Sequence, residues 1–327
     1  MHTSDFFRHH SPRGVRRAAL TVAAPMLAAA ALAGTGGIVP VSAAPIRWQS
    51  SPRVITAIGA ENEYANVIGQ IGGRYVNVAS ILNNPNTDPH TFESSPSVAE
   101  EVSRAQLIVQ NGLGYDSFMN KIESASPSSS RRIITVQSLL GLSNDTPNPH
   151  LWYNPETMPT VALAIATDLA GLDPSEASYF EANLKTFDNA LSPWLNAIVE
   201  FTAKYSGITV ATTEPVADYM LNAIGAHNST PFGLQADIMN GVDPSPQDIS
   251  LQESLLSSHK VKVFVYNQQV VDSLTTSFRT AAEKAGIPVV GVYETMPTPG
   301  YNYQTWMLAE VEAVEKAVAD KGSTEHL

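Results

Sequence analysis

The sequence contains no cysteine among its 327 residues, so disulfide bonds and thiolate metal ligands are excluded. A metal site in this chain must use nitrogen and oxygen ligands, supplied by histidine and carboxylate side chains. The lipid-modified cysteine that anchors many exported proteins is excluded as well. We therefore expect a protein that is not lipid-anchored through cysteine.

Basic residues are scarce. The chain has 19 lysines and arginines against 31 aspartates and glutamates, a formal charge of −12. Nucleic-acid binding needs a basic stripe that neutralises phosphates, and no such stripe is present. The acidic balance favours solubility and mildly favours cations as ligands, but it sets no specificity.

Two common hydrolase motifs are also missing. The sequence has neither the H-E-x-x-H pattern of zinc proteases nor the G-x-S-x-G nucleophile elbow. We therefore expect a protein that is not an enzyme. A secreted metal-dependent hydrolase is kept as the alternative, and it would need an open coordination position for water and a general base.

Residues 1–43 have the pattern of a secretory signal, with a basic start, an apolar alanine-rich middle and a small-x-small exit at Val41-Ser42-Ala43. Pro25 and several glycines in the apolar stretch argue against a retained membrane anchor. Removal of the signal would take away four arginines and one aspartate, leaving 15 basic and 30 acidic residues, a formal charge of −15. We expect an exported protein, periplasmic or extracellular.

Short β-branched runs alternate with helical stretches along the rest of the chain, which predicts α/β layers built on parallel sheets. The predicted strands cover residues 53–58, 76–81, 105–110 and 131–136, then 207–212, 260–266 and 287–293. The predicted helices cover residues 61–72, 95–104, 115–124 and 156–170, then 215–225, 246–258, 269–285 and 301–320.

The length favours two domains. We predict an N-terminal lobe over residues 44–172 and a C-terminal lobe over 207–327, each a parallel-sheet α/β sandwich. One long backbone helix over 173–206 is predicted to join them. It begins at an N-cap with proline in the first turn, and Pro193 should kink it or split it in two.

Two Pro-His dipeptides follow polar loops sixty residues apart and present His90 and His150. Proline fixes its own φ and restricts its neighbour, so each histidine leaves its loop in a set direction. Glu214 and Glu294 each follow a predicted strand directly, and strand ends in such sheets form the ligand crevice. Each residue alone also has an ordinary explanation as a loop or helix-terminus group, and the spacing leaves both explanations open.

Several segments resemble one known family over nearly all of residues 52–321. These are "ILNNPNTDPHTFESSPS", "NPHLWYNPET", "ATTEPVADYM" and "VVGVYETMPTPGYNYQTWM". The chain resembles the solute-binding proteins of zinc and manganese ABC importers, the cluster A-I family, whose lobes are joined by one rigid helix. The resemblance implies that His90, His150, Glu214 and Glu294 are the metal ligands.

The sequence departs from this family at three points. Glu294 stands where the family more often has aspartate, the long histidine-rich loop that would precede His150 is absent, and so is the lipid-anchor cysteine. Glu214 and the missing loop favour manganese, whereas zinc binds such ligands more tightly in general. The resemblance thus implies one Zn²⁺ or Mn²⁺ ion as the transported ligand.

The function expected from these observations is capture of one divalent transition metal between two lobes, for delivery to an ABC permease in the membrane. A free metal scavenger with no transporter is a further alternative. We expect a monomer that binds no nucleic acid. Glu61 and Glu63 could line the cleft behind the ligands, but a plain surface role is the interpretation we adopt. Trp152, Tyr153 and Trp306 are expected to pack the lobe interface.

Overall fold

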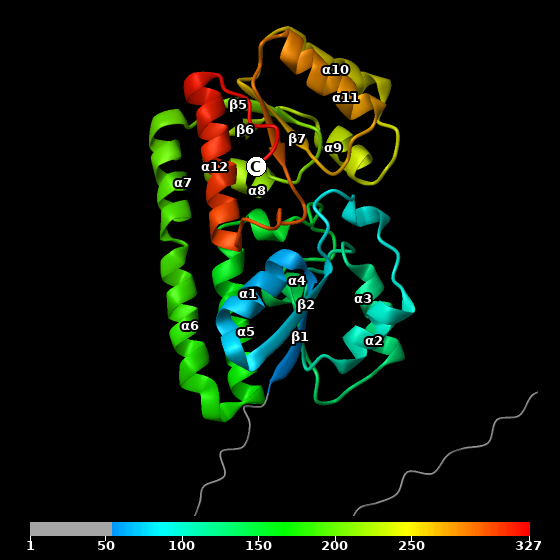
Figure 1. The fold of residues 1–327 in the computed structure, drawn as a ribbon. Coiled ribbons are helices and arrows are strands. Elements are labelled where there is room, and N and C mark those ends of the chain that lie inside the picture. The colour runs from blue at the N-terminus through cyan, green and yellow to red at the C-terminus, as the bar shows by residue number, and fades with distance from the viewer. Residues whose placement is uncertain (1–53) are drawn as a thin grey trace, which may run out of the picture. The chain divides into compact units, whose positions relative to one another are not determined.

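The computed structural model describes residues 54–327, and the predicted signal over residues 1–43 lies outside them. Two four-stranded parallel sheets organise this part of the chain, and both belong to one unit, Ser50–Leu327. The α/β class with two lobes of parallel sheet is therefore confirmed. Figure 1 shows the second sheet in the upper part of the view and the first sheet in the lower part, each with helices packed beside it.

The first sheet has the strand order β2-β1-β3-β4. Its elements, in chain order, are β1 (Ile55–Glu61), α1 (Asn62–Gly72), β2 (Val76–Leu82), α2 (Pro96–Arg104), β3 (Leu107–Gln110), α3 (Ser117–Ala125), β4 (Arg132–Thr135), α4 (Val136–Leu139) and α5 (Thr157–Leu172). Every residue of β3 is buried, as expected for a parallel strand covered on both faces.

The second sheet repeats this arrangement with the order β6-β5-β7-β8. Its elements, in chain order, are β5 (Thr209–Thr212), α8 (Asp218–Ala223), β6 (His227–Asn228), α9 (Phe232–Met239), α10 (Pro246–Ser257), β7 (Val263–Asn267), α11 (Ser273–Lys284), β8 (Val289–Val292) and α12 (Tyr303–Asp320). The short strand β6 and the helices α4 and α9 were not predicted.

In both sheets the strand order reverses beside the first strand of the lobe, β1 or β5. Ligand crevices in open α/β sheets lie at such a reversal, outside the carboxyl ends of the strands. The loops that follow the strands of both lobes are therefore the segments expected to form a binding site.

The long helix predicted over 173–206 is two α-helices, α6 (Ala177–Ala190) and α7 (Ser192–Tyr205), preceded by a 3₁₀ turn over Pro174–Glu176. The split occurs at Pro193, one of the two outcomes predicted for this residue, because proline is tolerated only in the first turn of a helix. Figure 1 shows α6 and α7 end to end, with α12 beside α7. Helix α6 packs against α1 and α5, and helix α7 packs against α12.

Direct hydrogen bonds join the two lobes. Asn62 at the start of α1 exchanges hydrogen bonds with the backbone of Met296, and the Gln70 side chain pairs with Gln304 of α12. Tyr153 donates to the carbonyl oxygen of Tyr293, as expected of an aromatic at the interface. Within residues 54–327, no helix combines the length and the apolar character needed to cross a membrane.

Candidate metal centre

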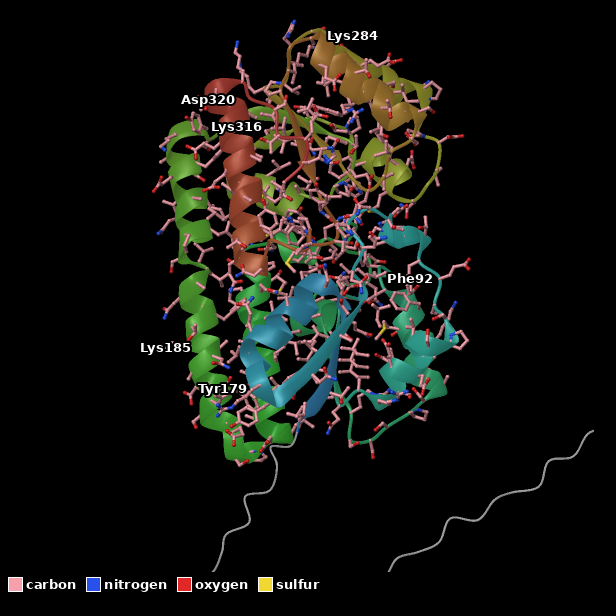
Figure 2. All side chains as sticks on the ribbon, viewed as in Figure 1. Phe92, Tyr179, Lys185, Lys284, Lys316 and Asp320 are labelled. Carbon is pink, nitrogen blue, oxygen red and sulfur yellow. The ribbon has the colours of Figure 1, made fainter. Side chains whose placement is uncertain are left out.

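The His90 loop begins after β2 and turns through a 3₁₀ helix, Pro89–Thr91. Asp88 caps this turn, since its Oδ1 accepts from the His90 backbone N–H at 2.8 Å. Phe92, labelled in Figure 2, packs its ring on Phe118 of α3 with centroids 4.7 Å apart. The cap and the aromatic contact hold His90 at the edge of the site, where 24% of its side chain stays exposed.

His150 is buried and its orientation is set by Asn148. The Asn148 Oδ1 accepts from the His150 backbone N–H at 3.0 Å and lies 2.8 Å from the ring Nδ1. The Asn148 Nδ2 donates to the carbonyl oxygen of Pro215 in the second lobe, which leaves Oδ1 for the histidine. The ring Nδ1 therefore faces Asn148 and the ring Nε2 faces the site, the orientation that a metal-ligating histidine needs.

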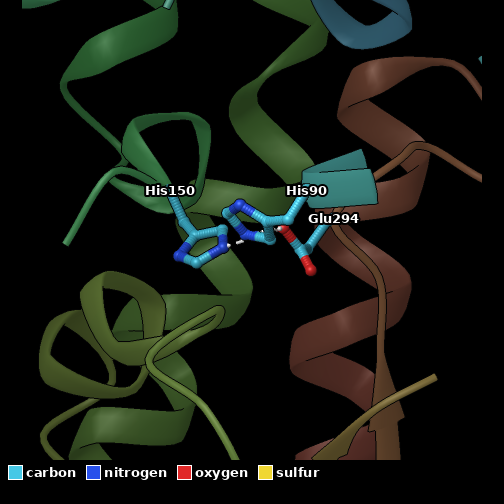
Figure 3. Close-up of side chains that lie close together, drawn as sticks. All are labelled: His90, His150 and Glu294. Atoms are coloured by element: carbon cyan, nitrogen blue, oxygen red, sulfur yellow. Dashed lines mark hydrogen bonds and ion pairs between the residues drawn. The ribbon is translucent and has the colours of Figure 1, made fainter. Parts of the chain in front are cut away.

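Glu294 follows β8 and is fully buried. Its Oε2 lies 3.2 Å from the Nε2 atoms of both His90 and His150, and it accepts a 3.0 Å hydrogen bond from the Tyr115 hydroxyl. One ligand atom from each of these three residues lies within 4.8 Å of the others (Figure 3). Two histidines of the first lobe and a carboxylate of the second thus meet at one point.

Glu214 follows β5 and is also buried, but it does not belong to this group of three mutually close ligands. Its Oε1 accepts from Asn267 Nδ2 at 3.2 Å, and the same nitrogen donates to Glu294 Oε1 at 2.6 Å. The Glu214 Oε2 has no hydrogen-bond partner among the described residues. The structure brings three of the predicted ligands together and connects the fourth to them through one amide.

The charges of the two glutamates differ. Burial raises the pKa of Glu214 well above its usual value, and the nearby charge of Glu294 raises that pKa further. Burial also disfavours ionisation of Glu294, but hydrogen bonds from His150 and His90 outweigh it and lower the pKa below the usual range. Glu294 is thus the carboxylate that is ionised at the site, with Glu214 as a buried acid that retains its proton more readily.

The pKa of His90 is also set in part by Glu294. Burial lowers the pKa of His90, whereas the hydrogen bond and the charge of Glu294 raise it, and the net pKa lies above the usual histidine value. A cation must displace this proton before the imidazole nitrogen can coordinate.

The structure adds residues that sequence reasoning missed. Tyr115, Asn148, Asn267 and Gln269 all bond ligand residues or the backbone beside them. Asn267 is the last residue of the buried strand β7, just as Glu214 and Glu294 follow β5 and β8. This position at a strand end was the sequence feature that could have identified it.

The surface role adopted for Glu61 and Glu63 is wrong. Both side chains are buried, and their carboxylate oxygens have no hydrogen-bond partner within residues 54–327. Burial raises the pKa of each well above the usual value, and a neighbouring carboxylate adds to the rise, Asp116 for Glu61 and Glu294 for Glu63. Both acids lie behind the ligands, at the junction of β1 and α1.

Comparisons with known proteins place the chain among metal-binding components of ABC importers. The model of the ZnuA family, the periplasmic component A of zinc-uptake complexes, matches residues 60–317. The manganese ABC transporter substrate-binding lipoprotein PsaA of Streptococcus anginosus is 23% identical over 257 residues, which cover 73% of this chain and 80% of that protein. The corresponding lipoprotein scaA of Streptococcus gordonii is 24% identical over 258 residues, 73% of this chain and 79% of that protein. These relatives are substrate-binding proteins, which confirms the expectation that the chain is not an enzyme.

Solved structures share the fold. A crystal structure of ZnuA superimposes with a TM-score of 0.65 at 20% identity, over 81% of this chain and 100% of that one. The periplasmic zinc-binding protein TroA of Treponema pallidum gives a TM-score of 0.68 at 17% identity, over 82% of this chain and 99% of that one. The two-lobed architecture described above is therefore one that these proteins share.

Proposed function

Because the chain belongs to the ZnuA family of periplasmic metal-uptake components, we propose that it captures one divalent transition metal ion, Zn²⁺ or Mn²⁺, between its lobes. The ion is the cargo, and a membrane ABC permease receives it. Several of the relatives that match, PsaA and scaA among them, are named as manganese ABC transporter substrate-binding lipoproteins, which supports this role. We propose that the protein acts as an exported monomer and binds no nucleic acid.

One observation carries the proposal. The Nε2 atoms of His90 and His150 come from the first lobe and the Oε2 atom of Glu294 from the second, and they meet at a point where only His90 is partly exposed. Buried charges are costly unless they are paired or coordinate a metal. Two imidazoles and a carboxylate are ligands that suit zinc and other borderline metals. We propose Glu214 as the fourth ligand, because its second oxygen is buried and unpartnered.

Metal bound in this way links the lobes. Histidines of one lobe and glutamates of the other would coordinate the same ion, so its release requires the lobes to separate. We propose lobes over residues 44–172 and 207–327, a connecting segment over 173–206 and an export signal over 1–43. The first sheet falls within the first of these ranges and the second sheet within the last. The partly exposed His90 is the ligand through which a permease or solvent would first reach the ion.

Metal binding is tested by elemental analysis of protein purified without added metal, followed by competition with a chromogenic chelator. We expect one ion per chain. The variants His150→Ala and Glu294→Gln should lower affinity by at least about 100-fold, because a lost ligand costs more than a lost outer partner. His227→Ala is the matched control, since His227 is exposed on β6 and outside the site. Wild-type protein that binds neither zinc nor manganese would overturn the proposal.

Delivery to a permease is tested in cells. Deletion of the gene should reduce uptake of labelled zinc or manganese at low external metal, and a copy encoding His150→Ala should fail to restore it. Unchanged uptake in the deletion strain, with metal binding intact in vitro, would instead identify a metal scavenger that works without a transporter.

A further inference from the structure

Asn267, the last residue of β7, occupies a position between the two glutamates of the second lobe. Its Nδ2 donates to Glu294 Oε1 at 2.6 Å and to Glu214 Oε1 at 3.2 Å. An amide nitrogen carries two protons, so one asparagine can satisfy both carboxylates. The side chain is buried, and these hydrogen bonds are therefore shielded from water.

The orientation of this amide is determined by its other contacts. The Asn267 Oδ1 accepts from the Gln269 backbone N–H at 2.9 Å, and the Asn267 backbone N–H donates to the Thr213 hydroxyl at 3.0 Å. Because the oxygen already has this partner, the nitrogen must face the two carboxylates. The amide is fixed before any metal arrives.

Each glutamate thus has one oxygen held by Asn267 and a second oxygen that Asn267 does not touch. For Glu294 the second oxygen is Oε2, which lies beside His90 and His150 and accepts from the Tyr115 hydroxyl. For Glu214 the second oxygen is Oε2, which is buried without a hydrogen-bond partner among the described residues. A short hydrogen bond to a carboxylate oxygen competes with a metal for the electron density of that oxygen and so disfavours it as a second ligand atom.

We propose that Asn267 determines metal selectivity, by restricting Glu214 and Glu294 to one coordinating oxygen each and so favouring zinc over manganese. This inference rests on the proposed function. One oxygen from each glutamate and one nitrogen from each of His90 and His150 make four ligands. Zinc is commonly four-coordinate, whereas manganese suits sites with more oxygen ligands. Asn267 is a positioning residue that acts through the two glutamates.

The test compares zinc and manganese affinities of the wild type with those of Asn267→Leu and Asn267→Asp. Leucine has the same branching as asparagine and removes both donors, and aspartate removes the donors but keeps the oxygen that accepts from Gln269. Both variants release Oε1 of each glutamate from the amide. We expect the preference for zinc over manganese to fall by about 10- to 100-fold, the range seen when outer partners of metal ligands are removed. X-ray absorption is read on manganese-loaded Asn267→Leu, which adds no oxygen ligand of its own, and it should show more oxygen neighbours than in the wild type.

Gln268→Leu is the matched control. Gln268 is the next residue along, and its side-chain nitrogen has no hydrogen-bond partner in the described chain. This change should leave the zinc-to-manganese ratio as in the wild type. Thermal unfolding of the metal-free variants checks that each is folded.

The outcomes separate the two proposals. Wild-type protein that binds neither metal would refute the function itself. Wild-type protein that binds manganese more tightly than zinc would refute the inference alone. Asn267 variants whose ratio of zinc to manganese affinity equals that of the wild type would also refute the inference. An equal loss of both affinities would indicate that Asn267 has a structural role only.

Discussion

Glu310 should make the protein less stable as pH rises, and its replacement by glutamine should remove that effect. This residue of α12 is fully buried. Its Oε1 accepts from the Trp306 indole at 2.9 Å and from the Tyr153 hydroxyl at 3.1 Å, while Oε2 has no partner among the described residues. Burial raises the pKa of Glu310 to about 8, although the two hydrogen bonds oppose the rise.

The sign follows from comparing the folded and unfolded states. Below the unfolded pKa, near 4.5, the side chain is protonated in both states and its contribution to stability is fully present. Between this value and about 8 the unfolded chain releases the proton and the folded chain retains it, so stability falls with pH. Each unit of pKa difference corresponds to about 1.4 kcal/mol, which makes the loss roughly 4 kcal/mol between pH 5 and pH 8.

Glutamine keeps the oxygen that accepts from Trp306 and Tyr153 but does not titrate. Its amide nitrogen would occupy the place of the unpartnered Oε2, and an unsatisfied buried group costs about 1–3 kcal/mol at every pH. Glu310→Gln is therefore expected to be less stable than the wild type at pH 5 and more stable at pH 8. The change in the difference, about 4 kcal/mol, does not depend on the amide cost.

The assay is urea unfolding of metal-free protein at pH 5, 6, 7 and 8, with the free energy of unfolding compared between variant and wild type. Other buried acids contribute equally to both proteins and cancel in the difference. Glu312→Gln, an exposed position on the same helix, is the control and should show no such trend. A difference between Glu310→Gln and wild type that stays constant from pH 5 to pH 8 would refute the reasoning.

Three further outcomes are expected. Zinc affinity should fall on acidification from pH 8, because the pKa values of His90 and Glu214 are raised and zinc must displace their protons. The expected fall is about tenfold per pH unit for each proton displaced. Flat affinity in chelator competition down to pH 5.5 would contradict this. The Gln269 side chain donates to the Thr87 carbonyl oxygen of the His90 loop and accepts from the Glu294 backbone N–H. Gln269→Ala should therefore release metal about tenfold faster in stopped-flow chelation. An unchanged release rate would show that these two hydrogen bonds do not retain the metal. Zinc at 100 times its dissociation constant should add about 2.7 kcal/mol to the free energy of unfolding, and Glu294→Gln at the same zinc concentration should not gain it.

Local sequence patterns determined most elements of the fold. Buried β-branched runs predicted seven of the eight strands, and caps such as Ser95 and Asn302 mark helix starts where they were expected. The missed strand, β6, has two residues, too few for any period to be visible. The break in the connecting helix at Pro193 was likewise predictable from local sequence, because it depends only on the backbone around the proline.

The loop histidines were also readable from the sequence, since proline sets the local direction of the chain at both positions. The glutamates after β5 and β8 were found because strand ends in parallel sheets face one crevice. Which side chains meet there depends on strand order and lobe packing, and these arise from contacts distant in the sequence.

Only the tertiary structure decided two features of the site. Asn267 bridges two glutamates because β7 lies between β5 and β8 in the sheet, an order that no local pattern encodes. Glu63 is buried at the start of α1, where its neighbour Asn62 exchanges hydrogen bonds with Met296 of the second lobe. The sequence by itself thus specified the local elements and the chemical nature of the ligands, whereas the distances between groups, their burial and hence their pKa values came from long-range packing.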